Sequence, residues 1–82
     1  MEYTFHSDAG HGWLEVRKRE LEDLGLADKV SSYSYVRGDK VYLEEDCDAS
    51  LFINALDGKG VKPSIIYAAQ ETESFIRSLR RY

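Results

Sequence analysis

The sequence predicts a small α+β domain, with an antiparallel sheet of hairpin-linked strands and two or three short helices on one face. Short runs alternate polar and apolar residues, as half-buried strands do, and glycine-containing turns separate them. Other stretches repeat apolar residues at helical spacing. The 82 residues form one domain (1–82), and 43% hydrophobic and 32% charged residues are typical of a folded protein.

The first third of the chain predicts a β-hairpin followed by a helix. Residues 2–7 and 12–16 alternate, and Asp-Ala-Gly between them has turn chemistry. Residues 17–24 are rich in helix formers, and Gly25 and Leu26 match the C′ and C″ positions of a Schellman stop. Basic residues begin this helix and acidic residues end it, which opposes the helix macrodipole. We therefore expect tertiary packing to hold it.

A second hairpin is the clearest supersecondary pattern. Residues 30–36 and 40–44 alternate on either side of an Arg-Gly-Asp turn. Arg-Gly-Asp is also the integrin-binding tripeptide, but the chain shows no secretion signal, so we interpret it as a turn only.

The second half predicts a helix over 49–56, with Asp48 as its N-cap and glycines 58 and 60 at its end. Residues 64–68 favour a strand and 72–80 a helix, although one continuous helix also fits the apolar spacing. The predicted core contains the large apolar residues of these elements: Phe5, Trp13, Val16, Leu21, Leu24, Leu26, Val30, Tyr35, Val41, Leu43, Phe52, Ile53, Leu56, Ile65, Phe75, Ile76 and Leu79.

The most informative local feature is a run of four carboxylates within five residues, where the second hairpin ends. Asp46 and Asp48 have a structural role available, because carboxylates stabilise a helix N-terminus. Helix capping does not account for Glu44 and Glu45, so an acidic face for a basic partner is the alternative to a solvated rim. The predicted partner-binding residues are those of the acidic run and the hairpin beside it: Tyr33, Arg37, Tyr42, Glu44, Glu45, Asp46 and Asp48.

Metal and nucleophile chemistry have weaker signals. His6, Asp8 and His11, with Glu15 nearby, are candidate metal ligands, but they match no established ligand spacing. Cys47 precedes a helix, yet acidic neighbours surround it, so we interpret it as a small buried hydrophobic residue. We expect no cofactor and no catalytic activity.

The composition restricts the class of binding partner and the cellular compartment that we expect. A net charge of −4 disfavours direct nucleic-acid binding, although the basic clusters at 17–19 and 77–81 could form one patch if they met. The single cysteine excludes an internal disulfide, and no apolar run reaches the length of a membrane span. We expect a cytoplasmic protein that does not bind membranes.

The segments His-Gly-Trp-Leu-Glu-Val (11–16), Ser-Tyr-Ser-Tyr (32–35) and Tyr-Leu-Glu-Glu-Asp-Cys-Asp (42–48) resemble a family of small uncharacterised bacterial proteins associated with phages and mobile elements. The resemblance covers roughly residues 3–57. It implies an inhibitor of host defence, of the anti-CRISPR or antirestriction type, and it transfers no catalytic residues.

The sequence therefore predicts a protein-binding inhibitor or adaptor that docks an acidic face onto a basic nucleic-acid-processing protein. Two alternatives stay open. One is a metal-binding or catalytic domain centred on His6 and His11, and the other is a module that pairs its sheet edge with a second copy.

Overall fold

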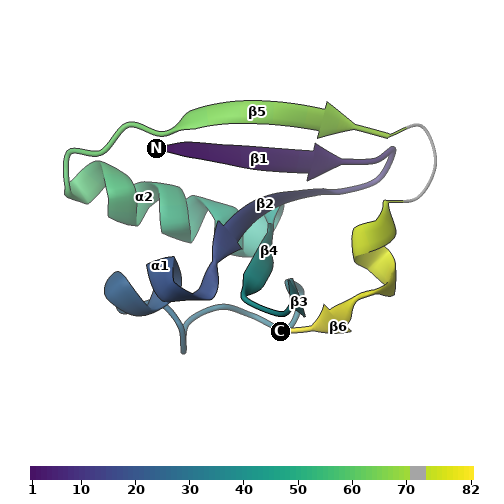
Figure 1. Cartoon of the computed structure of the whole chain (residues 1–82), viewed down its shortest axis with the longest axis horizontal. Helices are drawn as coiled ribbons and strands as arrows, with labels where there is room; N and C mark the ends of the chain where they lie inside the picture. The colour runs from purple at the N-terminus through teal and green to yellow at the C-terminus, as the bar shows by residue number, and fades with distance from the viewer. Residues whose placement is uncertain (71–73) are drawn as a thin grey trace.

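The computed structural model describes residues 1–70 and 74–82, and it has the predicted α+β class. Six strands of the described residues form one sheet in the order β5-β1-β2-β4-β3-β6 (Figure 1). The strands are β1 (Glu2–Ser7), β2 (Gly12–Arg17), β3 (Tyr35–Arg37), β4 (Lys40–Glu44), β5 (Ser64–Ala69) and β6 (Arg80–Arg81). The helical segments are α1 (Lys18–Asp23), the π-helical turn η1 (Glu45–Ala49), α2 (Ser50–Gly58) and the 3₁₀ turn η2 (Phe75–Ser78).

Strand pairing follows the two predicted hairpins, β1–β2 and β3–β4. The first hairpin joins the second through β2 and β4, which are antiparallel. β5 then pairs with β1 in parallel, after a crossover that contains α2. All other neighbours are antiparallel, so the sheet is mostly but not wholly of the predicted type.

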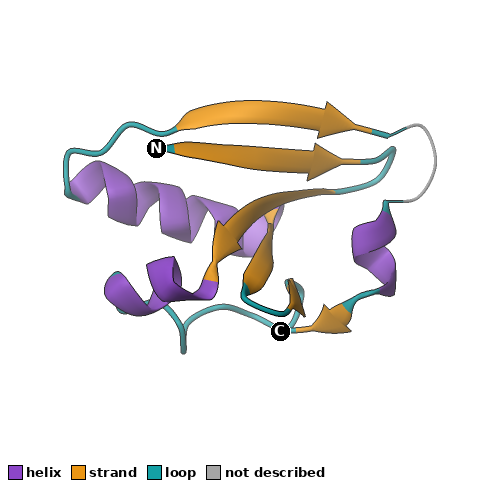
Figure 2. Cartoon of the chain, viewed as in Figure 1, coloured by secondary structure: helices purple, strands orange, loops and turns teal. Residues whose placement is uncertain are grey.

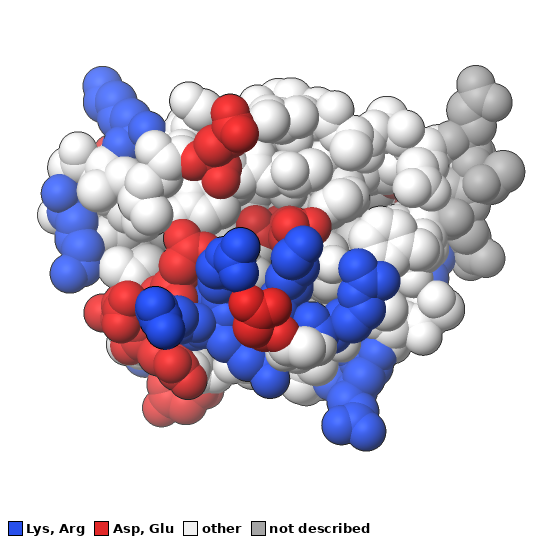
Figure 3. Space-filling view, viewed as in Figure 1, with Lys and Arg blue, Asp and Glu red and all other residues white. Residues whose placement is uncertain are grey.

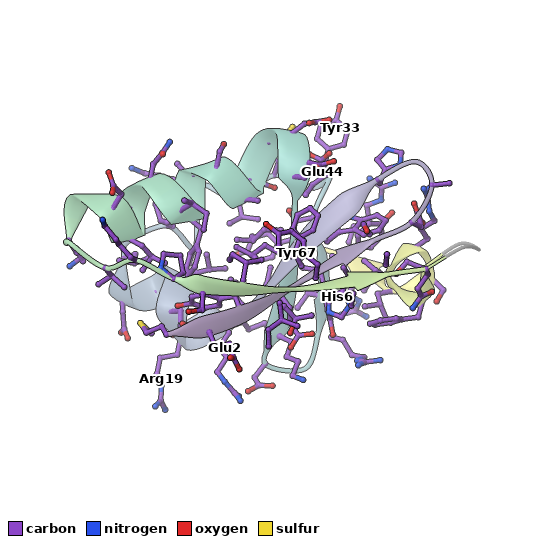
Figure 4. The ribbon with its side chains drawn as sticks, turned by 90° about the horizontal axis from the view of Figure 1, so that it is seen from above. Glu2, His6, Arg19, Tyr33, Glu44 and Tyr67 are labelled. Atoms are coloured by element: carbon purple, nitrogen blue, oxygen red, sulfur yellow. The ribbon has the colours of Figure 1, made fainter. Side chains whose placement is uncertain are left out.

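The sheet buries side chains on both of its faces. On the helix face, strand residues such as Leu14 and Leu43 pack against Leu21 of α1 and Phe52 of α2. Figures 2 and 4 show α1 and α2 beside the strands, with α2 lying along one side of the sheet. On the second face, Trp13, Tyr35 and Tyr42 pack beneath Ile76 of η2. The C-terminal helical segment therefore does not share a face with the other two.

This two-sided burial explains two core residues that the sequence analysis missed, Leu14 and Tyr42. Tyr3, also missed, lies on the helix face, where its ring packs edge-on to Phe52. Alternate residues of a strand point to opposite faces, so a prediction that buries only one face assigns half of each strand to solvent. The opposite error was made for Phe75, which was predicted to be in the core but is a 37% exposed residue.

The predicted stop of α1 is confirmed. The Gly25 amide donates to the Glu22 carbonyl at 3.0 Å, and the Leu26 amide donates to the Leu21 carbonyl at 2.8 Å. This is the Schellman pattern, and Gly25 adopts the φ of +71° that the pattern requires. The Glu20 side chain closes the other end by accepting from the Arg17 amide. The short helix is thus held at both ends despite its unfavourable charge order.

Two predicted elements have different bounds. The strand expected over 30–36 is regular only from Tyr35, because Ser31 and Ser34 bond instead to the buried Asp48 carboxylate. The helix expected after an Asp48 cap begins earlier, with a helical turn from Glu45 that Glu44 caps. Asp48 lies inside that turn, so its assignment as N-cap is wrong.

The C-terminal segment contains both a confirmed and a wrong prediction. The strand over 64–68 is confirmed as β5. Of the helix expected over 72–80, residues 72 and 73 lie outside the described residues. The remainder is a single 3₁₀ turn, after which Arg80 pairs with Val36 as part of β6. The Ser74 hydroxyl accepts from the Ile76 amide at the start of the turn, and Leu79 is already extended.

Candidate protein-binding surface

Glu44 is a capping residue rather than a surface acid. Its carboxylate accepts from the amides of Asp46, at 3.0 Å, and Cys47, at 2.9 Å. These amides belong to the first turn of η1 and would otherwise have no partner. The residue is only 8% exposed. The helix start therefore explains Glu44, which the sequence analysis left without a structural role.

Asp48 fastens a distant loop to η1. The residue is 3% exposed. Its carboxylate accepts from the Ser31 amide at 3.1 Å, the Ser31 hydroxyl at 2.7 Å and the Ser34 hydroxyl at 2.5 Å. The Ser34 oxygen in turn accepts from the Glu44 amide at 2.9 Å. Buried carboxylates are tolerated when donors saturate them in this way. Asp48 thus holds residues 31–34 against the end of β4.

The side chains of Glu45 and Asp46 remain exposed, and Tyr33 lies on the loop that Asp48 fastens. Tyr33 is 61% exposed, and Figure 4 shows it close to Glu44, near the start of α2. No ion pair forms at Glu45 or Asp46 within the described part of the chain. We call Tyr33, Glu45 and Asp46 the acidic turn surface.

Cys47 is exposed, so its assignment as a buried hydrophobic residue is wrong. The reason is local, since Cys47 lies in the same outward-facing turn as Glu45 and Asp46. Desolvation raises the pKa of its thiol, and the nearby Glu44 carboxylate raises it further. A thiol of raised pKa is a poor nucleophile at neutral pH.

The other two predicted contact residues lie apart from the acidic turn surface. Tyr42 is fully buried on the second face, where its ring packs edge-on to Phe75. Arg37 is exposed on that face; its guanidinium lies 5.2 Å from the Phe75 ring centre, and its Nη2 lies 3.5 Å from the Tyr42 hydroxyl. Four of the seven predicted residues, Arg37, Tyr42, Glu44 and Asp48, are therefore not part of the outward acidic surface.

The four candidate metal ligands separate into two unconnected groups. His6 Nε2 lies 2.9 Å from Glu15 Oε1, and Lys40 approaches the other Glu15 oxygen at 3.4 Å. Asp8 and His11 contact Arg77 instead. Among residues 1–70 and 74–82, no cluster of three His, Cys, Asp or Glu side chains could hold a metal ion.

The Asp8 carboxylate links the first hairpin to the C-terminal segment through several hydrogen bonds. It accepts from Arg77 Nε at 2.6 Å, from Arg77 Nη2 at 2.9 Å and from the Ser74 amide at 3.0 Å. The Gly10 and His11 amides also donate to it. The Arg77 hydrogen bonds, followed by that of Ser74, hold the pKa of Asp8 well below its ordinary value.

The second face carries a row of cations. Register places Lys40 opposite both Arg17 and Arg37 on neighbouring strands. Arg17 pairs with Asp39 at 2.8 Å and Lys40 with Glu15, which offsets part of the repulsion. Figure 3 shows Lys and Arg side chains gathered over the middle and lower part of this view.

The two basic clusters of the sequence also approach one another, because Lys18, Arg80 and Arg81 line one shallow hollow. Arg77 does not line it and lies with Asp8 instead.

An apolar groove of about 500 Å³ runs between α2 and β5. Phe5, Ile53, Ile65 and Tyr67 line it, and Glu45 stands in its wall. The acidic turn surface is thus continuous with an apolar one, a combination that the sequence did not indicate.

The chain matches no protein-family model, no curated protein and no solved structure. No helix in the described residues has the length and apolar character needed to cross a bilayer.

Proposed function

We propose that the protein is a small inhibitor or adaptor that binds a basic protein partner through the acidic turn surface. One observation carries the proposal. Glu44 and Asp48 are buried and their carboxylates accept hydrogen bonds that hold the turn and the 31–34 loop, whereas Glu45 and Asp46 stay exposed beside Tyr33. The hydrogen bonds of Glu44 and Asp48 restrain the turn and the loop before a partner binds, which lowers the conformational entropy lost on binding. The proposal includes no catalytic step and no cofactor.

The chemistry of the surface favours a cationic partner. Two carboxylates without an ion pair in the described structure attract Lys and Arg side chains and steer their approach. Tyr33 adds a large aromatic contact at small entropic cost, a property typical of interface hot spots. A local acidic contact agrees better with 11 basic and 15 acidic residues than does imitation of DNA by the whole surface.

The partner class we propose is a nucleic-acid-processing protein, because such proteins expose basic channels. The resemblance of residues 11–16, 32–35 and 42–48 to phage and mobile-element proteins supports a host-defence target of the anti-CRISPR or antirestriction kind. The proposal places the protein in the cytoplasm, where its one cysteine would stay reduced.

The test compares capture of host proteins by three forms of the chain. Glu45→Lys/Asp46→Lys reverses the exposed charges and leaves the Glu44 cap intact, and Asp57→Lys is a control at an exposed acid near the far end of α2. We expect wild type and Asp57→Lys to capture one basic nucleic-acid-processing protein that the double variant does not.

The partner is then purified and its affinity measured. We expect the double variant to bind at least about 10-fold more weakly, equivalent to about 1.4 kcal/mol, and wild-type association to slow as salt rises. Equal affinity of all three forms would contradict the proposal, provided that their unfolding curves agree.

A further inference from the structure

The two edges of the sheet are built differently. β6 has two residues, both arginines, and such short charged edges resist pairing with other chains. β5 has six residues, none of them charged and none of them proline. Within the described residues, β5 pairs with β1 alone, which leaves its outer side open. β5 thus lacks the usual protections of an edge strand.

The backbone of β5 presents hydrogen-bonding groups to the outside. The Ser64 amide donates to the Met1 carbonyl at 2.8 Å, and the Gln70 amide donates to the Ser7 carbonyl at 2.9 Å. These bonds place the even-numbered residues of β5 toward β1. Because successive residues of a strand direct their backbone groups to opposite sides, the amides and carbonyls of Ile65, Tyr67 and Ala69 point outward.

The side chains of β5 also favour an apolar neighbour. Tyr67 is 76% exposed and Ile66 is 47% exposed, on opposite faces of the strand. In Figure 3 the surface over β5 is largely without charge. Behind it, the groove between α2 and β5 offers apolar contacts to Ile53 and Ile65.

Charge along the groove selects one direction for an added strand. Glu45 stands in the wall at the η1 end, whereas exposed Lys59 and Lys62 follow the C-terminal end of α2. If β5 of a second copy pairs antiparallel with β5 of the first, Lys62 of each copy lies toward the Glu45 end of the other. If the two strands paired in parallel, the Lys62 side chains of the two copies would lie together, and so would the Glu45 side chains.

We propose that a second copy of this chain occupies the β5 edge, forming a symmetric dimer with a continuous sheet. When the pairing is centred on Tyr67, the outward groups of Ile65 oppose those of Ala69 in the second copy, so all three outward residues are paired. The exposed tyrosines then lie over the two grooves, and the isologous contact closes on itself. The dimer and the proposed partner share one residue, Glu45, which belongs to the acidic turn surface and also lies in the wall of the groove.

The contact is small, and its strength should be correspondingly modest. Stable interfaces bury roughly 1,600 Å² in total, whereas one strand pair and two grooves form an interface at the lower end of the size range. We therefore expect a dimer dissociation constant in the micromolar range. The average molar mass in solution should then rise with protein concentration between about 1 µM and 1 mM.

The first experiment is sedimentation velocity of purified protein, comparing Tyr67→Lys with Tyr33→Lys. Both are exposed tyrosines, but only Tyr67 lies on the β5 edge. We expect Tyr67→Lys to raise the dimer dissociation constant at least about 10-fold and Tyr33→Lys to leave it unchanged. A wild-type monomer at every concentration, or a dimer that Tyr67→Lys leaves intact, would overturn the proposal.

Charge exchange tests the direction of pairing. Glu45→Lys and Lys62→Glu should each weaken the dimer, and the double variant should restore it, because it exchanges the two charges within one chain. Failure of the double variant to recover would exclude the antiparallel arrangement. The double variant should not recover binding of a basic partner, because the acidic turn surface still lacks the Glu45 carboxylate. Recovery of the dimer without recovery of partner binding therefore separates the dimer from the proposed function.

Hydrogen exchange on the wild-type protein needs no variant. The Ile65 and Tyr67 amides should be protected at high protein concentration and exchange rapidly on dilution, whereas the inward Ile66 amide stays protected throughout. If the Ile65 and Tyr67 amides exchange rapidly at all concentrations, the edge is not paired. If a partner's strand occupies the edge instead, these amides become protected only when that partner is added, and the dimer proposal is wrong.

Discussion

Replacing Asp48 with alanine should destabilise the protein far more than replacing Asp46, two residues away in the same acidic run. Asp48 is buried and receives the Ser31 amide, the Ser31 hydroxyl and the Ser34 hydroxyl. Asp46 is exposed and its carboxylate accepts no hydrogen bond within the described structure. The two residues therefore separate the structural from the surface use of the same chemical group.

The magnitude follows from the donors that lose their acceptor. A buried donor left unsatisfied costs about 1–3 kcal/mol. Ser34 is fully buried and incurs this cost, whereas half-buried Ser31 can turn partly to water. We expect Asp48→Ala to lower the unfolding free energy by about 2–4 kcal/mol, a large part of the roughly 5–15 kcal/mol that such domains have. Asp46→Ala should stay within about 0.5 kcal/mol of wild type.

Urea unfolding followed by tryptophan fluorescence measures this difference, because the single tryptophan, Trp13, is buried. Asp48→Asn adds a graded step, since the amide keeps one acceptor oxygen and should lose less than alanine does. The reasoning fails if Asp48→Ala unfolds within about 0.5 kcal/mol of wild type, or if Asp46→Ala is equally costly.

Two further predictions address the first hairpin. Asp8 has a depressed pKa in the folded state, so it stabilises the fold above its unfolded pKa of about 4 and loses this contribution as pH falls. Asp8→Asn should therefore be less stable at neutral pH and show a shallower acid decline in pH-dependent unfolding; parallel curves would contradict this. Gly12→Ala would bring its Cβ into steric overlap with a ring carbon of Phe5, so the ring must move, at a cost of about 1–3 kcal/mol. An unchanged urea midpoint would show that Phe5 relaxes freely.

Local pattern was sufficient for most elements of the fold. Period-2 alternation located the strands of both hairpins, and the β-branched and aromatic residues Ile65, Ile66 and Tyr67 located β5. The stop at Gly25 and Leu26 followed from the Schellman requirement for a left-handed residue. These features depend on neighbours within a few residues, so the sequence contains the necessary information.

The errors occur where distant residues compete for local groups. Residues 30–34 alternate like a strand, but the Asp48 carboxylate takes the Ser31 amide from any strand partner. The apolar spacing near the C-terminus fits a helix, but Val36 offers a strand edge that Arg80 joins. In both cases a long-range hydrogen bond overrode a local preference.

The acidic run itself shows the same division. Sequence alone determined that four carboxylates would lie together at a helix start, and that at least some had a structural reason to be there.

Only the tertiary structure decided which acids are buried, because burial depends on donors brought from the 31–34 loop and on the turn that Glu44 caps. It likewise decided that β5 is an open edge. Strand order depends on how apolar side chains from several elements, Ile65 of β5 among them, pack around α2, and the local pattern of residues 64–69 does not reveal that arrangement.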